Sequence, residues 1–426
     1  MNAMTYSPPN LGRWIIWGAT GLLMLVLPLF FTKGFSITLL SQMGIGIIFA
    51  LSYNMLLGQA GMLSFGHAVY SGLGAYFAIH ALAVMGKGGW PIAVTWLPLI
   101  GGLAGAFFGC VFGYVSTKRA GTTFAMISMG LGELVFNCSL MFPGFFGGEG
   151  GINANRVVGT PFLGIDYKSG TQVYYLVAVW TFVCMAAMYA FTHTPLGRMS
   201  NAVRDNPERA EFVGYDTQKV RWIVMIVASF FAGVAGGLSA VMFEIVTAEN
   251  VSAVRSGGVL LATFIGGVTF FFGPILGACL FAFFVIALSE FTKAWLLYLG
   301  FFFVIMVMVA PGGLASLIMM QFPVARVGRL KEMMLPYAKC LGAMLLMLAG
   351  AIVLIETGYY ASLELVNGPT TKLWGITYDV TGAAPWLIGI GLLAGGTWVF
   401  RLVGAQLSAK WSAVQDEIAR RAGLTA

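Results

Sequence analysis

Long apolar runs separated by short polar stretches make up most of this chain. A run of about 18 or more apolar residues is long enough to cross a bilayer as a helix, and lipid requires every backbone N–H and C=O to be paired internally. A membrane β-barrel would show segments of about 10 alternating residues, and the sequence has none. The pattern predicts an all-α polytopic membrane protein. Twelve spans are expected, near residues 14–31, 37–57, 61–83, 92–116, 122–142, 172–191, 222–243, 257–271, 273–291, 295–310, 339–357 and 384–403.

Two of these runs, 257–271 and 273–291, are short and are separated by the Gly273-Pro274 pair. Proline interrupts a helix because it lacks an N–H and clashes with the preceding turn. The sequence leaves two interpretations open for 257–291, a re-entrant hairpin or two broken helices.

Composition excludes a soluble globular protein. The 426-residue chain is 59% hydrophobic and only 9% charged, whereas soluble domains carry about 25% charged residues. The net charge of +7 does not require a nucleic-acid partner, because basic cytoplasmic loops give the same excess. No small-residue cleavage pattern follows the first run, so we interpret it as a transmembrane helix and not as a signal peptide.

Basic residues predict the orientation. With a cytoplasmic N-terminus, 16 of the 23 Lys and Arg residues fall on the cytoplasmic side and seven on the other. Since cytoplasmic loops are enriched in Lys and Arg, both termini are expected in the cytoplasm. This parity also holds if 257–291 is one re-entrant unit.

Glycine is frequent inside the apolar runs. The chain has 57 glycines, and pairs such as Gly101–Gly105 and Gly233–Gly237 have small-xxx-small spacing. This spacing lets two helices approach closely, so these pairs predict dense helix packing.

The sequence shows no catalytic constellation. The five cysteines form no CxxC pair, and His67, His80 and His193 are far apart, which indicates neither a disulfide framework nor a metal site. The phosphate-binding pattern G-x-x-x-x-G-K-[ST] does not occur. We therefore predict that the chain is not an enzyme and has no catalytic residue, no metal and no cofactor of its own.

Charge gathers in one stretch, Leu196–Asp216, which holds seven charged residues between two apolar runs. Asn206 is a good N-cap, Pro207 suits the first helical position and Glu208 suits the positive helix start. Gly214 is a natural helix stop. A helix over Pro207–Val213 is predicted, and because two turns are unstable alone it docks against something. A solvated structural loop and a docking surface for a cytosolic partner are both open.

Four blocks of the chain carry a family pattern. They are "LLGQAGMLSFGHAVYSGLGAY" (56–76), "PLGRMSNAVRDNPERAEFVGYDTQKVRWIVMIVASFFAGVAGGL" (195–238), "GGVLLATFIGGVTFFFGPILGACL" (257–280) and "LGFFFVIMVMVAPGGL" (299–314). Their order and spacing resemble the LivM-type family, the permease subunits of branched-chain amino acid ABC importers, over about residues 35–320.

The resemblance implies a mechanism. In this family two paralogous permease subunits form the pathway in the lipid bilayer, a periplasmic solute-binding protein delivers the amino acid, and two cytosolic ATP-binding subunits use the ATP. A short cytoplasmic coupling helix transmits their movement to the permease. By resemblance, the ATPase-coupling residues are Ala202, Arg204, Asp205, Asn206, Pro207, Glu208, Arg209, Ala210, Glu211 and Gly214.

Five polar residues within the apolar runs are candidates for lining the pathway, because polar groups at membrane depth usually face the bundle interior. Glycines around the first three predict an irregular or tightly packed helix, where a structural role is the alternative. The last two lie four apart on one helical face. The candidates are Gln59, Ser64, His67, Glu133 and Asn137. Charges near the expected periplasmic ends, such as Glu244, are interpreted as interfacial.

Three parts are expected: an N-terminal segment with the first helix (1–35), the permease core of about ten spans (36–320) and a C-terminal extension (321–426). The extension carries two further transmembrane helices and an amphipathic tail in which Leu407, Trp411, Val414 and Ile418 recur at helical spacing. The sequence gives no role for the extension.

Other functions stay open at this stage. The same machine could carry urea, short amides or another small polar solute, and neither the cargo, its contact residues nor the partner permease can be read from one subunit. An ion-coupled secondary transporter, with Glu133 as an ion site, is a different class of explanation.

Overall fold

The computed structural model describes residues 11–90, 92–158, 164–363, 368–373 and 376–421. The chain divides into two compact units. The core unit comprises Met1–Ala287 and Phe303–Ala315, and the C-terminal unit comprises Leu288–Phe302 and Ser316–Ala426. The second unit begins close to the boundary expected after residue 320 and also takes in residues 288–302.

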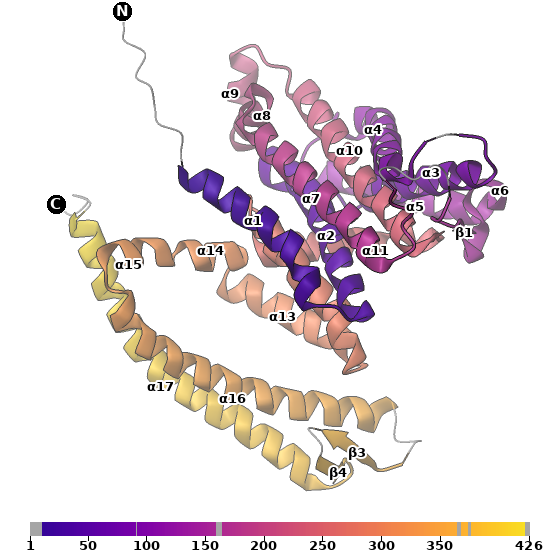
Figure 1. The fold of residues 1–426 in the computed structure, drawn as a ribbon. Helices are drawn as coiled ribbons and strands as arrows, with labels where there is room; N and C mark the ends of the chain where they lie inside the picture. The colour runs from indigo at the N-terminus through magenta and orange to yellow at the C-terminus, as the bar shows by residue number, and fades with distance from the viewer. Residues whose placement is uncertain (1–10, 91, 159–163, 364–367, 374–375, 422–426) are drawn as a thin grey trace, which may run out of the picture. The chain divides into compact units, whose positions relative to one another are not determined.

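Helices account for nearly all of the regular structure in the described residues (Figure 1). Nine of the described helices are long and apolar enough to cross a membrane, and a bent pair, Trp295–Val309 with Gly313–Val327, gives a tenth. The predicted all-α polytopic class is confirmed. Two of the twelve predicted spans, 14–31 and 257–271, fall on shorter apolar helices.

The core unit begins with ten helices and one two-stranded antiparallel ladder, β1–β2. Their bounds are α1 Leu11–Phe30, α2 Gly34–Asn54, α3 Ala68–Gly86, α4 Leu97–Ser116, α5 Thr122–Met141, α6 Pro143–Phe146, β1 Ile152–Asn153, α7 Gly170–His193, α8 Pro195–Asp205, α9 Pro207–Phe212, α10 Thr217–Phe243 and β2 Ile245–Val246. The chain continues through α11 Ala253–Gly266, α12 Gly273–Ala282, α13 Trp295–Val309 and α14 Gly313–Met319.

Glycine contacts hold α10 at the centre of the core unit against α3 and α4. A Cβ at Gly101 would lie 2.6 Å from the carbonyl oxygen of Gly233, and one at Gly74 would lie 2.7 Å from the same oxygen. No side chain fits between these backbones, so the pairs Gly101–Gly105 and Gly233–Gly237 face one another as their spacing predicts. This packing fixes the position of α10 within the core unit.

Two interruptions divide helices of the core unit. After α2 comes a π-helical turn, Met55–Gln59, and residues 61–67 are not helical, so the span predicted for 61–83 is wrong at its start. Gly61 has φ +66°, which an L side chain adopts only with strain. We call residues 61–67 the first break.

The second break is residues 267–272, between α11 and α12. Gly267 has φ +103° and turns the chain, so that α11 packs back against α12. The 14 residues of α11 rise about 21 Å, less than the roughly 30 Å of a hydrocarbon core. The structure has features of both interpretations left open for 257–291. The short helix α11 packs back against α12, as in a re-entrant hairpin, and the helical path is interrupted at the second break.

The C-terminal unit is built on a helical hairpin. Its elements are α15 Gln321–Val327, α16 Leu330–Leu363, β3 Thr370–Leu373, β4 Ile376–Asp379 and α17 Ala383–Arg421. Helices α16 and α17 run antiparallel, and a Cβ at Gly350 would lie 2.6 Å from the backbone nitrogen of Leu393 (Figure 1). Val324, Met333 and Val414 form a small buried cluster near one end of the hairpin.

Candidate functional site

We refer to Thr192–Arg221, which runs from the last turn of α7 into the start of α10, as the charged segment. Thr194 caps its first helix, because its Oγ1 accepts a hydrogen bond from the N–H of Gly197 at 3.1 Å. Pro195 then occupies the first turn of α8. The sequence analysis missed this helix, although a threonine followed by proline is a typical helix start.

The chain breaks at Asn206, whose φ of −155° is extended, and restarts as α9. Asn206 Oδ1 accepts the N–H of Arg209 at 2.9 Å, and Gly214 with φ +94° follows the end of the helix. The predicted N-cap and glycine stop are confirmed. The helix ends at Phe212, one residue before the predicted end.

A small apolar cluster attaches α9 to its own chain. Val203 from α8, Ala210 from α9 and Val220 from α10 are buried together, with Leu196 and Met199 beside them. Only one face of α9 is therefore covered.

The uncovered face of α9 and its flanks is mixed, polar and aromatic. Phe212 is 89% exposed and Val213 is 71% exposed. Sequence reasoning missed both, although an apolar residue on a short polar helix was the available signal. Among the predicted coupling residues Ala210 alone is buried. The exposed ones are Ala202, Arg204, Asp205, Asn206, Pro207, Glu208, Arg209, Glu211 and Gly214.

Arg204 connects the charged segment to α2. Its Nε and Nη2 each lie 2.8 Å from Asp205 Oδ1, and its Nη1 donates to the carbonyl oxygen of Gly58 in the π-helical turn. Gly61 lies beside the same side chain, since a Cβ there would be 2.7 Å from Arg204 Cγ. One side chain therefore reaches both the π-helical turn and the first break.

A cavity of about 580 Å³ lies beside this contact. Predicted pathway residue Gln59 lines it, together with Asn54. Both side chains are at least nine-tenths buried, and their oxygens Oε1 and Oδ1 have no hydrogen-bond partner among the described residues. The other lining residues are Leu57, Gly58, Thr192, Asn201, Arg204, Phe264, Val268, Thr269 and Phe271.

Ser64 and His67 lie in the first break and are fully buried in the core unit. His67 Nε2 is 3.0 Å from Ser52 Oγ, and its ring stacks on Phe49. The hydroxyl of Tyr53 donates to the backbone carbonyl of Ser64. This packing favours a structural role for both residues.

Glu133 and Asn137 share one face of α5, as their spacing predicts, but this face is exposed on the core unit and does not face its interior. Asn137 Nδ2 donates to the carbonyl oxygen of Glu133 at 2.7 Å. Met126 and Met129, on the same helix, are 75% and 50% exposed. The two polar residues point outward from the core unit and do not enter its packed interior.

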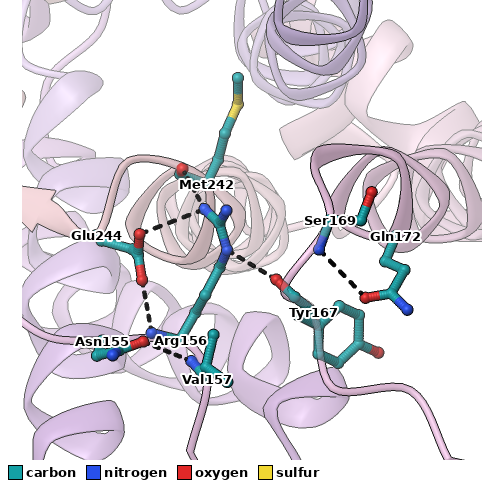
Figure 2. A network of polar contacts seen from close by, with 8 residues as sticks. All are labelled: Asn155, Arg156, Val157, Tyr167, Ser169, Gln172, Met242 and Glu244. Carbon is teal, nitrogen blue, oxygen red and sulfur yellow. Dashed lines mark hydrogen bonds and ion pairs between the residues drawn. The ribbon is translucent and has the colours of Figure 1, made fainter. Parts of the chain in front are cut away.

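The loop between α5 and α7 is fastened to the far end of α10 by Arg156 (Figure 2). Arg156 Nε donates to the carbonyl of Tyr167 at 2.9 Å and Nη1 donates to the carbonyl of Met242 at 3.1 Å. Its backbone N–H donates to Glu244 Oε1 at 2.8 Å, and Nη1 lies 3.5 Å from Glu244 Oε2. Glu244 is thus an ion-pair partner of Arg156, and its interpretation as an interfacial charge stays a prediction.

This Arg156 network borders a second cavity, of about 690 Å³. Strands β1 and β2 pair beside it, with Ile152 opposite Val246. The cavity is lined by Asn153, Ala154, Asn155, Arg156, Val157, Lys168, Phe243, Glu244 and Ile245.

Interrupted helices beside a cavity with polar lining residues, in a polytopic helical membrane protein, are typical of membrane transport proteins. The family follows from sequence comparison. Residues 35–310 match the family model described as the permease component of branched-chain amino acid transport systems, and the chain belongs to that family.

Two relatives carry the name high-affinity branched-chain amino acid transport system permease protein LivM. The one from Salmonella typhimurium is 26% identical over 308 residues, covering 67% of this chain and 71% of the relative. The one from Escherichia coli is 27% identical over 289 residues, covering 63% and 67%. No solved structure matches the chain. The family match stops at residue 310, before most of the C-terminal unit.

Proposed function

We propose that this chain is a transmembrane permease subunit of an ATP-driven importer for branched-chain or related amino acids. It forms the pathway with a paralogous permease in the bacterial inner membrane, with both termini in the cytoplasm. A periplasmic binding protein supplies the amino acid, and two cytosolic ATPase subunits supply the energy.

The observation that carries the proposal is the charged segment of a chain in the permease family. Helix α9 is capped at its start and held through Ala210, while Phe212 and Val213 are exposed. An exposed aromatic residue on a pre-formed helix is suited to a pocket on a partner, because it buries a large apolar area at small entropic cost. We assign this face to the ATPase.

The pathway is assigned to the surface of the core unit. Glu133 and Asn137 lie on the exposed face of α5, where a second permease covers them in the assembly. An ionisable residue is costly in lipid, so a protein-facing or water-facing position accounts for Glu133. Gln59 belongs to the cavity beside the π-helical turn.

The test is a cysteine crosslink from Glu208→Cys to a co-expressed ATPase subunit, in an active background without the five native cysteines. A specific, nucleotide-sensitive crosslink is expected. Val254→Cys is the matched control: it is also strongly exposed, with Val254 at 85%, but lies at the end proposed to face the periplasm. It should react with an external membrane-impermeant thiol reagent and form no crosslink.

The opposite outcome is equally clear. If Glu208 and its neighbours form no crosslink, and uptake continues without the ATPase but stops with an uncoupler, the protein is an ion-coupled secondary transporter. If the crosslink forms but uptake selects urea or short amides, the protein is still a permease of an ATP-driven importer, and only the proposed substrate is wrong.

A further inference from the structure

Arg204 sits in the last turn of α8, directly before the chain breaks at Asn206. Asp205 Oδ1 accepts from Nε of Arg204 and lies 2.8 Å from Nη2, which fixes the guanidinium plane. The remaining nitrogen, Nη1, donates to the carbonyl oxygen of Gly58. Because arginine is always charged and planar, this is an oriented contact between α8 and α2.

Gly58 lies within the π-helical turn Met55–Gln59. Such a turn shifts the hydrogen-bond register of a helix and is frequent at functional sites. On its other side Gly58 contacts the second break, since a Cβ there would lie 2.7 Å from the carbonyl oxygen of Val268. Gly58 is therefore in contact with the charged segment and with the α11–α12 turn.

Gly61 opens the first break with φ +66° and leaves space for the stem of Arg204. The Arg204 side chain thus touches the first break directly and the second break through Gly58. These contacts are within the core unit, and the Arg204–Gly58 bond joins residues 146 positions apart in the sequence.

We propose that Arg204 is the positioning residue that transmits movement of the charged segment to both helix breaks of the permease. This inference rests on the proposed function, which supplies the ATPase that moves the segment. The π-helical turn and the second break line the 580 Å³ cavity, where the oxygens of Asn54 and Gln59 have no partner among the described residues. Displacement of the guanidinium therefore changes the inner wall of a polar cavity without opening the glycine-packed helices.

The test uses the complete transporter, with both permeases and both ATPase subunits, reconstituted in lipid vesicles. A reporter cysteine replaces Thr269, which is exposed, lines the cavity and belongs to the second break. In the otherwise unchanged protein the rate of thiol labelling at this position is expected to differ at least threefold between the nucleotide-free and ATP-bound states.

Arg204→Ala is expected to abolish this nucleotide dependence and to lower uptake at least tenfold, while the Glu208→Cys crosslink to the ATPase persists. Arg204→Lys keeps one donor for the Gly58 carbonyl but lacks the planar fork, so it should restore part of both readouts. Arg198→Ala is the matched control, because it removes the same charge from an exposed position on the same helix, and it should leave both readouts unchanged.

Gly61→Ala provides a second route to the same contact. Its Cβ would press on Arg204 Cγ, whereas Gly121→Ala adds a Cβ at a similar φ of +64° with nothing within 4 Å. Gly61→Ala should lower uptake more than Gly121→Ala. Most of that excess should disappear in the Arg204→Ala background, because the clashing methylenes are gone.

Each other outcome identifies what failed. If Glu208→Cys forms no crosslink in the protein that keeps Arg204, the proposed function itself is contradicted, and the Arg204 inference that rests on it falls as well. If the crosslink forms in the parent but disappears in Arg204→Ala, the residue acts in docking and the transmission idea is overturned. Normal uptake by Arg204→Ala, or labelling at Thr269→Cys that never depends on nucleotide, would also overturn it.

Discussion

The two ends of α10 show two ways of holding a loop with an arginine. At the Glu244 end, Arg156 bonds two backbone carbonyls and a carboxylate, and a β ladder adds further bonds. At the Asp216 end, Arg204 makes one bond to a distant carbonyl, Thr217 Oγ1 donates to Glu211 Oε1 at 2.8 Å, and a small apolar cluster supplies further contacts. Arg156 bonds three residues of its surroundings, whereas Arg204 bonds one distant residue besides its neighbour Asp205.

This difference suits two tasks. A loop whose arginine bonds several groups is suited to keeping its shape, while a loop whose arginine bonds one distant carbonyl is suited to passing a displacement to that carbonyl. The helix between them is rigid because backbone contacts at Gly101 and Gly233 leave no room for sliding. The predictions that follow act on one end and spare the other.

The largest effect is expected from Phe212→Asp. Phe212 is 89% exposed, so the permease folds normally, but a carboxylate cannot enter an apolar pocket without a desolvation cost. Co-purification of the ATPase should fall at least tenfold, with uptake falling in parallel. Val254→Asp, an equal change at the other end, should leave ATPase co-purification intact. Normal recovery of the ATPase with Phe212→Asp would show that this face is not the docking surface.

Arg156→Ala should act on stability. The side chain is only 18% exposed and makes charge-assisted bonds to Tyr167, Met242 and Glu244, each of which contributes about 1.5–3 kcal/mol when a charged group is involved. We expect a loss of at least about 2 kcal/mol, seen as a lower thermal midpoint in detergent. Lys168→Ala removes an exposed charge from the same loop and should not change the midpoint. Equal midpoints for the two variants would show that the Arg156 network does not fasten the loop.

The smallest effect concerns Asp216, which caps α10. Its pKa is lowered, mainly because the carboxylate accepts the backbone N–H of Lys219 and secondarily through contact with the Lys219 ammonium. A lowered pKa in the folded state means that the cap stabilises the helix start above the ordinary pKa near 3.8 and loses this effect as pH falls through the folded-state pKa.

Hydrogen exchange of the peptide around Lys219, corrected for intrinsic exchange, should therefore rise in acid. Asp216→Asn keeps a capping oxygen but does not titrate, so its corrected exchange should not depend on pH. The same acid response in Asp216→Asn would rule out the carboxylate as the cause.

Local features of this fold were readable from sequence. The cap at Asn206, the stop at Gly214 and the facing glycine pairs depend on neighbouring residues or on a fixed spacing, so their chemistry is visible in one stretch. The helix α8 was readable too, from Thr194 and Pro195, but the predicted helix began only at Pro207.

Long-range pairings were not readable. Arg156 and Glu244 lie 88 positions apart and Arg204 and Gly58 lie 146 apart, and no local pattern marks either member as the partner of the other. The burial of His67 and the exposure of Glu133 have the same origin, because apolar helices give no sequence signal for which face meets protein. Their roles depend on packing that only the assembled helices define.

The hairpin of the C-terminal unit is longer than any membrane requires. The 34 residues of α16 and the 39 of α17 rise about 51 and 58 Å, against roughly 30 Å of hydrocarbon. Lys331, Lys339 and Lys410 lie toward the end where Val324, Met333 and Val414 pack together, and a basic end is the one expected in water. A bilayer of that thickness covers only part of the length of this helix pair. A thinner membrane would therefore leave more of the pair in water, so its exposed length would report the thickness of the bilayer around it.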